Sequence, residues 1–333
     1  MTLTFGLLHT WHPTHAQSVK DYVGFAQAAE DAGFERIWVG DSPLIWQDVY
    51  VWLTVLALNT RRVSLGPGVT HPLVRHPAVT ASAIGTLNML SGGRMVVGIG
   101  AGDSAHGTVG IKPAEPAVVT EAIRLIKGLH RGEEVPFQDH QLKLVWSRQQ
   151  IPIYWSTGRR SCLALAGELC EGVILPSPVD ADILRRQVAV VREAAAATGR
   201  KPSDVKVCLW TNLYVATDEQ EIEQARFHTR ASANSRLRHS RWWLPPELRE
   251  RAQRIHAQYR YYEHGNEHAA QYEQTGMDAV ELMAIVGTPD QCIAKLRMCE
   301  EAGVDELMLG VSQFDNRLEL LQRIARDIMP AFR

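Results

Sequence analysis

The segment between residues 63 and 107 constrains the fold of this chain more than any other. It holds one apolar run at 63–65, a helical pattern at 78–90 and a second apolar run at 95–100. In the helical pattern apolar residues recur every three or four positions, and a Ser-Gly-Gly sequence follows it, as glycine follows many helices. Two buried strands joined by one helix indicate a parallel, right-handed βαβ unit.

A polar, glycine-rich turn follows each of these two apolar runs. The first turn reads Gly66-Pro67-Gly68-Val69-Thr70-His71, and the second reads Ala101-Gly102-Asp103-Ser104-Ala105-His106. Ligands of parallel α/β proteins bind beyond the carboxyl ends of the strands. Both turns therefore lie on the predicted ligand-binding side.

Six more apolar runs, separated by helical patterns, predict further strands of the same sheet. They occupy residues 5–8, 37–40, 151–155, 172–175, 205–215 and 307–309. Eight strands that alternate with helices predict an α/β fold, the (β/α)8 or TIM barrel, formed by residues 1–333 as a single domain. A doubly wound sheet is the alternative, but the alternation without a linker up to the eighth strand favours the barrel.

The pattern changes between about residues 226 and 278. This segment holds nine arginines together with several tryptophans and tyrosines. We interpret it as a long helical insertion after the seventh strand. A small hairpin is also expected around 135–144, before the fifth strand.

Composition excludes several classes of function. A net charge of -2 gives no argument for binding nucleic acid or an anionic membrane, and the apolar runs are too short to span a bilayer. The five cysteines form no CxxC pair and no zinc spacing, so we expect reduced, buried thiols. The first residues lack the basic region and apolar core of a signal peptide, which together with the thiols predicts a cytoplasmic protein.

Barrel enzymes build their sites from residues at the strand exits, and the polar residues there define one candidate site. These residues are His9, Trp11, Asp41, Ser42, Thr70, His71, Asp103, Ser104, His106, residues 156–161, Trp210 and Thr211. The histidines are not spaced as a metal site and lack a carboxylate cluster, so we expect no metal.

The exit of the fifth predicted strand has the features of a phosphate site. It consists of Ser156, Thr157, Gly158, Arg159, Arg160 and Ser161. A glycine and free backbone N–H groups at a helix N-terminus favour a bound phosphate, and the two arginines add charge-assisted donors. The alternative is a capped helix with a solvated arginine pair.

Two further features allow two interpretations each. The glycines around Pro67 permit backbone distortion and close approach of a ligand, or they form a loose turn. Asp103, in an apolar and glycine-lined setting, has a raised pKa and donates a proton, or it caps a helix or turn. Asp41 has the same two interpretations.

These residues resemble a known family. The segment GPGVTHPLVRHPAVTASAIGTLNMLSGGRMVVGIGAGDSA is similar to the signature of the bacterial-luciferase-like superfamily. Within it, the chain is most similar to the coenzyme F420-dependent oxidoreductases that include methylenetetrahydromethanopterin reductase. AEDAGFERIWVGDS, PIYWSTG and VGTPDQCIAKLRMCEEAGVDELML extend the resemblance over nearly the whole chain.

The resemblance implies coenzyme F420 as the cofactor, with FMN as the alternative. Relatives hold a non-prolyl cis peptide behind the cofactor ring where this chain has Gly68–Val69. Thr70 and His71 are then expected to line the ring, and most relatives carry Asn in place of this histidine. Asp41 matches a carboxylate near the polar edge of the ring.

Further roles follow from the same resemblance. Asp103 matches an acidic residue proposed as a proton donor, and Asp41, His9, His71 and His106 are the other candidates for proton exchange. The expected cofactor-binding residues are Asp41, Gly68, Val69, Thr70, His71, Gly102, Asp103, Ser104 and residues 156–161. Arg159-Arg160 is unusual in the phosphate loop. Ser42 stands where relatives that oxidise sugar phosphates have His, which argues against that substrate class.

The implied function is hydride transfer between C5 of F420 and a carbon of a small organic substrate. Trp11, Trp46, Trp242 and Tyr261 are candidates for the substrate wall, with core or dimer packing as the alternative for each. The alternative function is an FMN-dependent monooxygenase that uses reduced flavin and O2. A flavin-binding protein without catalytic activity is the third hypothesis. Relatives commonly dimerise through the early helices, so we expect a homodimer.

Overall fold

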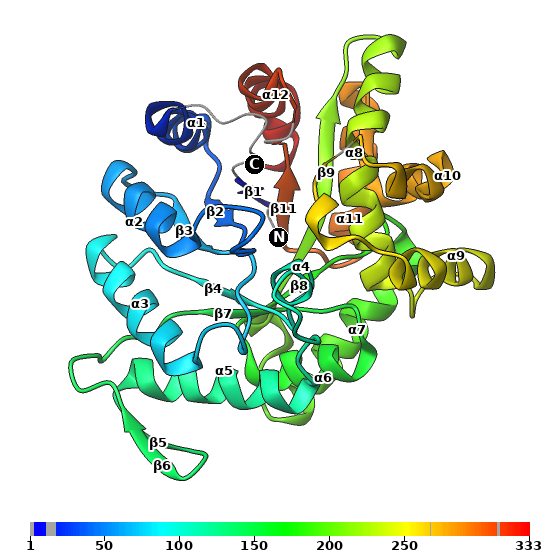
Figure 1. Ribbon diagram of the computed structural model, residues 1–333. Coiled ribbons are helices and arrows are strands. Elements are labelled where there is room, and N and C mark those ends of the chain that lie inside the picture. Colours follow the sequence, from blue (N-terminus) through cyan, green and yellow to red (C-terminus); the bar gives the residue numbers. More distant parts are fainter. Residues whose placement is uncertain (1–2, 11–17, 267, 312–313) are drawn as a thin grey trace.

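The computed structural model describes residues 3–10, 18–266, 268–311 and 314–333, and it is a parallel barrel surrounded by helices (Figure 1). The barrel strands are β1 (Thr4–Leu8), β2 (Arg36–Val39), β3 (Ser64–Pro67), β4 (Val97–Ile99), β7 (Ile153–Ser156), β8 (Gly172–Leu175), β9 (Lys206–Val215) and β11 (Glu306–Gly310). Their order is β3-β2-β1-β11-β9-β8-β7-β4. Parallel bridges from Leu65 to Met95 and from Thr70 to Ile99 close the ring, which confirms the predicted TIM barrel.

One strand was not predicted. The strand β10 (Ala284–Gly287) pairs in parallel with the second half of β9 and lies off the main path of the sheet. It follows a helix directly and is only four residues long, and such a short apolar run carries no period that separates it from the end of a helix.

Helices follow the barrel strands and cover the outside of the sheet, except for the short helix Ser104–Gly107, which lies at the barrel mouth (Figure 1). They are α1 (Val19–Ala32), α2 (Val49–Asn59), α3 (Pro77–Leu90), α4 (Ser104–Gly107), α5 (Pro116–Arg131), α6 (Arg160–Leu169), α7 (Ala181–Ala197), α11 (Pro289–Glu301) and α12 (Arg317–Arg323). The last continues as η5 (Ile324–Ile328) and η6 (Met329–Phe332), and η2 (Pro202–Asp204) precedes β9. The hairpin of β5 (Glu134–Phe137) and β6 (His140–Lys143) projects from the body, as predicted (Figure 1).

Local sequence signals set the helix ends. Ser18 and Thr288 each form a capping box with the residue three positions on, and Gly33 takes a left-handed conformation with φ of 93°. All three ends agree with the sequence pattern. No helix in the described parts of the chain is both long and apolar enough to cross a membrane.

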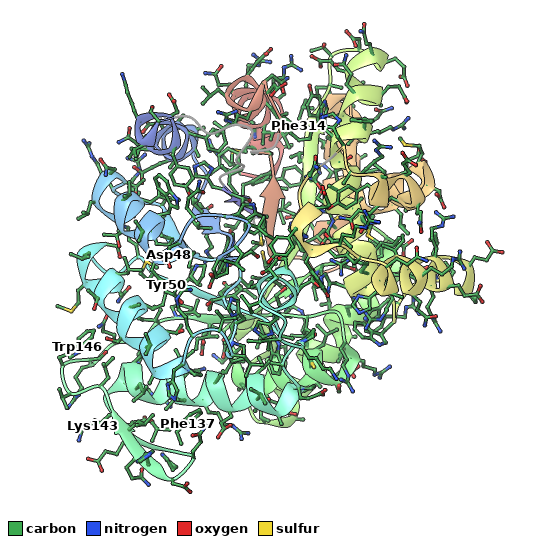
Figure 2. All side chains as sticks on the ribbon, in the orientation of Figure 1. Asp48, Tyr50, Phe137, Lys143, Trp146 and Phe314 are labelled. Carbon is green, nitrogen blue, oxygen red and sulfur yellow. The ribbon has the colours of Figure 1, made fainter. Side chains whose placement is uncertain are left out.

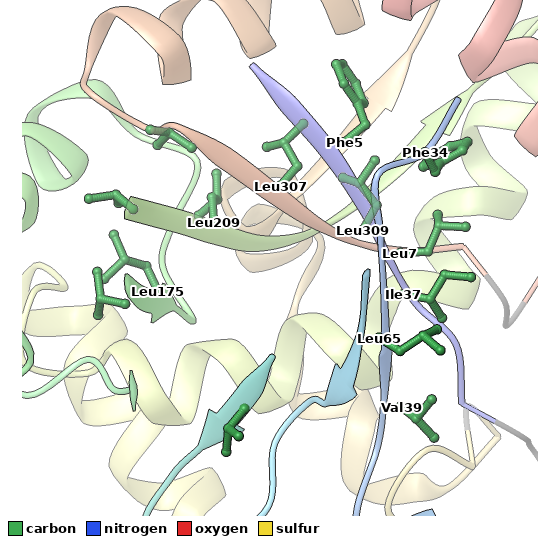
Figure 3. Packing of buried hydrophobic residues seen from close by; sticks show 14 of the residues in the cluster. Phe5, Leu7, Phe34, Ile37, Val39, Leu65, Leu175, Leu209, Leu307 and Leu309 are labelled. Carbon is green, nitrogen blue, oxygen red and sulfur yellow. The ribbon is translucent and has the colours of Figure 1, made fainter. Parts of the chain in front are cut away.

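Alternate residues of each strand face two different cores. Leu7, Ile37 and Leu65 pack toward the helices, in the large cluster that Figure 3 shows. Their neighbours along the strands, among them Trp38, fill the barrel interior with Tyr154, Ile174, Cys208 and Met308. The five cysteines are all free and buried, as predicted.

The insertion lies between β9 and β10 and covers one side of the barrel mouth (Figure 1). It comprises α8 (Glu219–Ser240), α9 (Pro246–Ala257), η3 (Tyr261–Glu263), η4 (Ala270–Thr275) and α10 (Met277–Met283). It is therefore longer at both ends than the predicted segment. A small apolar core that includes Leu237, Ile255 and Val280 holds its helices together.

Candidate functional site

A cavity of about 520 Å³ opens at the carboxyl ends of the barrel strands, between the barrel and the insertion. Its wall includes most of the predicted site residues. These are Asp41, Trp46, Gly68, Val69, His71, Gly102, Asp103, Ser104, Ser156, Thr157, Gly158, Arg159 and Trp242. The fold thus brings residues from four separate strand exits and from the insertion into one cavity.

Seven predicted residues are not part of this wall. They are His9, Thr70, His106, Arg160, Ser161, Thr211 and Tyr261, while Trp11 lies outside the described residues. His9, one of the candidates for proton exchange, does not line the cavity and packs against α1 instead. Its ring stacks on Tyr22 with centroids 3.9 Å apart, and its Nε2 lies 3.1 Å from the Tyr22 carbonyl oxygen. Burial lowers the pKa of His9 to about 4, so this histidine is a neutral packing residue.

Thr70 and His106 lie directly behind the cavity wall. Thr70 Oγ1 donates a hydrogen bond of 2.8 Å to Asp41 Oδ2. The His106 ring packs edge-on against His71, with centroids 4.8 Å apart, and its Nδ1 lies 3.1 Å from the Lys112 carbonyl oxygen. Both side chains therefore position residues of the wall.

The cavity floor is peptide backbone. The Gly68–Val69 peptide is cis, as the resemblance implied, and Gly68 N–H donates to the Val39 carbonyl oxygen at 2.7 Å. A Cβ at Gly66 would lie 2.2 Å from the Val96 carbonyl oxygen, and one at Gly98 would lie 2.5 Å from that of Pro67. These glycines are required because the backbones of β3 and β4 approach so closely.

Asp41 is held by a network at one edge of the floor. Besides Thr70, Arg75 contacts it, with Nη1 3.2 Å from Asp41 Oδ1. Arg75 also pairs with Asp48 and lies over the ring of Tyr50, two residues labelled at the start of α2 in Figure 2. Burial raises the pKa of Asp41, although Arg75 and Thr70 act in the opposite direction.

His71 lies beside Asp41 and is a buried imidazole without a hydrogen bond. Neither of its ring nitrogens has a hydrogen-bond partner among the described residues, and Nε2 lies 3.7 Å from Asp41 Oδ2. Burial, with smaller effects from His106 and Arg75, lowers the pKa of His71 to about 3. A buried polar group of this kind is costly unless a partner satisfies it. His71 is therefore available to a molecule in the cavity.

Asp103 does not have the environment predicted for a proton donor. Arg238 of α8 donates to both of its oxygens, at 3.1 and 2.7 Å, and His239 Nε2 lies 3.2 Å from Oδ2. Burial raises the pKa of Asp103, but Arg238 and His239 outweigh it and hold the pKa well below its usual range. Asp103 is not a side-chain cap either, because it makes no capping hydrogen bond to α4.

The insertion is attached to the barrel mouth by further contacts. Trp243 Nε1 donates to the Gly158 carbonyl oxygen at 2.5 Å, and the Tyr262 hydroxyl donates to the Thr108 carbonyl oxygen at 3.0 Å. Tyr261 covers Gly107, where a Cβ would lie 2.3 Å from its ring. Tyr261, which was predicted to form part of the substrate wall, therefore packs the insertion against the barrel.

The predicted phosphate loop borders the cavity at its other end. Gly158 and Arg159 line the wall, whereas Arg160 and Ser161 form the first turn of α6. Arg159 is the N-cap of α6 and makes no side-chain capping bond to it. The helix N-terminus therefore remains available to an anion, and Arg241 of the insertion lines the same cavity.

Several residues of the wall were not predicted. Ser235, His239, Arg241 and His264 come from the insertion, and the loop of residues 112–116 follows α4. Arg75, which holds Asp41, was also missed. The arginine-rich composition of the insertion was the only signal for its residues, and it does not indicate which side chains face the barrel.

Comparison with known proteins agrees with this architecture. A family model described as luciferase-like monooxygenase matches residues 2–306. A 5,10-methylenetetrahydromethanopterin reductase of Methanolobus tindarius is 30% identical over 319 residues, covering 92% of this chain and 94% of the relative. The enzyme of the same name from Archaeoglobus fulgidus is 31% identical over 325 residues, with the same coverage.

Solved structures share the fold. The coenzyme F420-dependent tetrahydromethanopterin reductase of Methanopyrus kandleri superposes with a TM-score of 0.80 at 22% identity, covering 100% of both chains. The oxygenating constituent of 3,6-diketocamphane monooxygenase from Pseudomonas putida, in complex with FMN, gives a TM-score of 0.70 at 19% identity, covering 99% of each chain. At these sequence identities, the superpositions show that the proteins share a fold.

Proposed function

The chain belongs to the family of luciferase-like monooxygenases, and we propose that within it this protein is an F420-dependent oxidoreductase that transfers hydride to or from a small organic substrate. The relatives at 30% and 31% identity carry the name of an F420-dependent type of reductase, which supports this choice. The matches to these two reductases span nearly the whole chain. They therefore support the presence of the whole cofactor and substrate site, and not only of part of it.

The observation that carries the proposal is the unpaired imidazole of His71 beside a floor of peptide backbone. The part of the wall formed at Gly68–Val69 and Gly100 contributes only glycine and valine residues, so a flat ring system can lie close to its backbone. At its edge the imidazole of His71 lacks a hydrogen-bond partner among the described residues, and one of its two ring nitrogens can bond to the polar edge of such a ring. These features fit a deazaflavin or a flavin.

The residues present have distinct tasks in this proposal. Coenzyme F420, when bound, would supply a ring carbon that accepts or donates hydride. Gly68 and Val69 would support the ring from behind, and His71 and Asp41 would bond to its polar edge. Gly158 and Arg159 would bind the phosphate. Trp46 and Trp242 exclude water from the reacting carbon, since hydride transfer requires positioning and a dry site.

Asp41 replaces Asp103 as the candidate for proton exchange. Burial raises the pKa of Asp41, whereas the ion pair with Arg238 keeps Asp103 ionised. A carboxyl group with a raised pKa can hold a proton nearer neutral pH and release it. Asp103 instead fixes the insertion against the barrel.

An FMN-dependent monooxygenase is the second candidate function. It has the support of the family description and of the FMN complex that shares the fold. The backbone floor and the phosphate loop suit either cofactor, because both carry a ring system and a phosphate.

Cofactor titration separates the two functions. The purified full-length protein is titrated with F420 and with FMN, and the fluorescence of each cofactor is followed. Tight F420 binding with much weaker FMN binding is the expected result. Preferential FMN binding, followed by oxygen uptake with reduced FMN, would establish the monooxygenase instead, and binding of neither cofactor would overturn both functions.

We also propose a homodimeric, cytoplasmic protein whose 333 residues fold as one domain. Exposed apolar side chains on α2 and α3 support a dimer: Val51, Leu58, Val79 and Met89 are each more than half exposed. Free cysteines support a reducing compartment. Sedimentation equilibrium tests the dimer, and a V51K/V79K double variant is expected to be monomeric.

A further inference from the structure

The insertion brings more positive than negative charge to the barrel mouth. Arg236, Arg238 and Arg241 follow one another at the end of α8. Of these three, only Arg238 has a carboxylate partner within the described parts of the chain, and that partner is Asp103. The other two arginines therefore keep a positive charge that no carboxylate in contact with them compensates.

Arg236 is completely buried behind the cavity wall. Its Nη2 donates to Asn212 Oδ1 at 2.7 Å and to the Met283 carbonyl oxygen at 2.8 Å, whereas Nε and Nη1 have no partner among the described residues. Burial lowers the pKa of Arg236 to about 9, so the guanidinium is still charged at neutral pH. It lies 5.5 Å from the ring centre of Trp210, which lines the cavity, and it adds positive potential there.

Arg241, in contrast, lines the cavity itself. Its Nη1 donates to the Arg238 carbonyl oxygen at 2.8 Å, and its guanidinium carbon lies 4.1 Å from the ring centre of Trp242. Its Nε and Nη2 have no hydrogen-bond partner in the described chain. These two nitrogens form the planar edge with which an arginine binds a carboxylate or a phosphate through two parallel hydrogen bonds.

The carboxylates of the cavity wall do not neutralise Arg241. Asp41 and Asp103 are each already paired with another arginine. The third carboxylate, Glu115, is exposed on the loop after α4, and the same loop carries the exposed Lys112 with the opposite charge. The wall is therefore positive on balance, and an anion in the cavity would meet attraction that water screens less than in bulk solution.

The proposed cofactor phosphate has its own position at Gly158 and Arg159, on the barrel. Arg241 belongs to the insertion, on the other side of the cavity, which a ring lying on the barrel floor leaves to the substrate. We propose that Arg241 binds a carboxylate or phosphate group of the substrate, with Lys112 adding to the attraction, so that the substrate is an anion. This inference rests on the proposed function, because it names the substrate class of the same site.

The test compares cyclohexanecarboxylate with cyclohexanecarboxamide, two probes of the same shape that differ in charge. Calorimetry measures the binding of each probe to the full-length protein, first alone and then saturated with F420. We expect the F420-saturated protein to bind the carboxylate about tenfold or more tightly than the carboxamide, the effect of one charge-assisted pair of hydrogen bonds. Since ions screen this attraction, the preference should fall as the salt concentration is raised.

Variants assign the preference to Arg241. R241Q should remove most of the preference for the carboxylate and leave carboxamide binding unchanged, whereas R241K keeps the charge and should retain part of the preference. R230Q is the matched control and should bind both probes as the wild type does. Arg230 also belongs to α8 and lies over an aromatic ring, that of Phe227, but it is not among the residues that line the cavity. If R241Q does not fold, the preference of the wild type and its salt dependence decide.

Three results would overturn the inference: equal binding of the two probes to the F420-saturated protein, an unchanged preference in folded R241Q, or carboxylate binding that F420 abolishes. In the last case the cofactor, and not the substrate, supplies the anionic group at Arg241. Each of these results leaves F420 binding intact and removes only the substrate assignment. Absence of F420 binding removes the proposed function itself.

Discussion

Arg238 donates two hydrogen bonds to Asp103, a residue 135 positions earlier in the chain. Its side chain is fully buried, and that of Asp103 is 18% exposed. The pair joins α8 of the insertion to the loop after β4. It thereby closes one side of the cavity and keeps the Asp103 carboxylate ionised.

Removal of the guanidinium should destabilise the protein strongly. R238M leaves Asp103 partly buried without its main partner, and breaking a buried pair in this way costs about 3–5 kcal/mol. We expect a loss of this size in the free energy of unfolding measured with urea. R185A, which removes an exposed ion pair with Asp182, is the control and should cost less than about 1 kcal/mol. Equal losses in the two variants would contradict the role of the Arg238–Asp103 pair.

The Asp103–Arg238 pair shows which features of this protein could not be predicted from the sequence. The caps at Ser18 and Thr288 were predictable because each capping box lies within four consecutive residues. The barrel was predictable because strand and helix periods are also local. The pairing of Asp103 with Arg238 depends on how the insertion folds back, and no spacing in the chain encodes that.

The prediction for His9 failed for a related reason. A polar residue at a strand exit can face the cavity or turn away from it, and only the packing of α1 decides. Here Tyr22 of α1 stacks on His9 and removes it from the site. For Asp41 the strand exit was identified, but its partner Arg75 was not, since Arg75 comes from the next βα loop.

His71 should make the stability of the protein depend on pH. Its folded-state pKa of about 3 lies below the ordinary value of 6.5, so the unfolded chain binds more protons between these values. Stability is therefore lost as the pH falls below 6.5, and His71 accounts for about 2 kcal/mol of that loss by pH 5.

The H71N variant tests this effect, because asparagine does not titrate. Urea unfolding of H71N and of the wild type at pH 7 and pH 5 should show a smaller loss in the variant, by about 2 kcal/mol. H140N, at an exposed histidine, should behave as the wild type does. A pH dependence of H71N identical to that of the wild type would show that His71 is already charged or exposed.

Gly158 should not tolerate a side chain. A Cβ there would lie 2.3 Å from the His239 carbonyl oxygen, which belongs to the backbone of α8 and cannot move alone. We expect G158A to cost about 1–3 kcal/mol and to weaken cofactor binding, because the insertion must shift away from the phosphate loop.

The matched control is G24A. A Cβ at Gly24, inside α1, meets nothing within 4 Å. Alanine is the better helix former, so G24A should be neutral or stabilising by up to about 1 kcal/mol. Thermal unfolding and F420 fluorescence titration of both variants give the two readouts, and a G158A protein as stable as G24A would contradict the close approach of α8.

The two adjacent arginines of the phosphate loop should differ in their effect on the cofactor. Arg159 lines the cavity at the N-cap of α6, whereas Arg160 begins the helix and lies outside the wall. A charge-assisted hydrogen bond contributes about 1.5–3 kcal/mol, so R159A should weaken F420 binding by roughly 10- to 100-fold. R160A removes the same charge one residue away and should change the affinity by no more than about twofold to threefold, through long-range attraction screened by salt. Titrations of both variants at two salt concentrations measure this contrast, and equal losses would mean that the loop attracts the phosphate by charge alone.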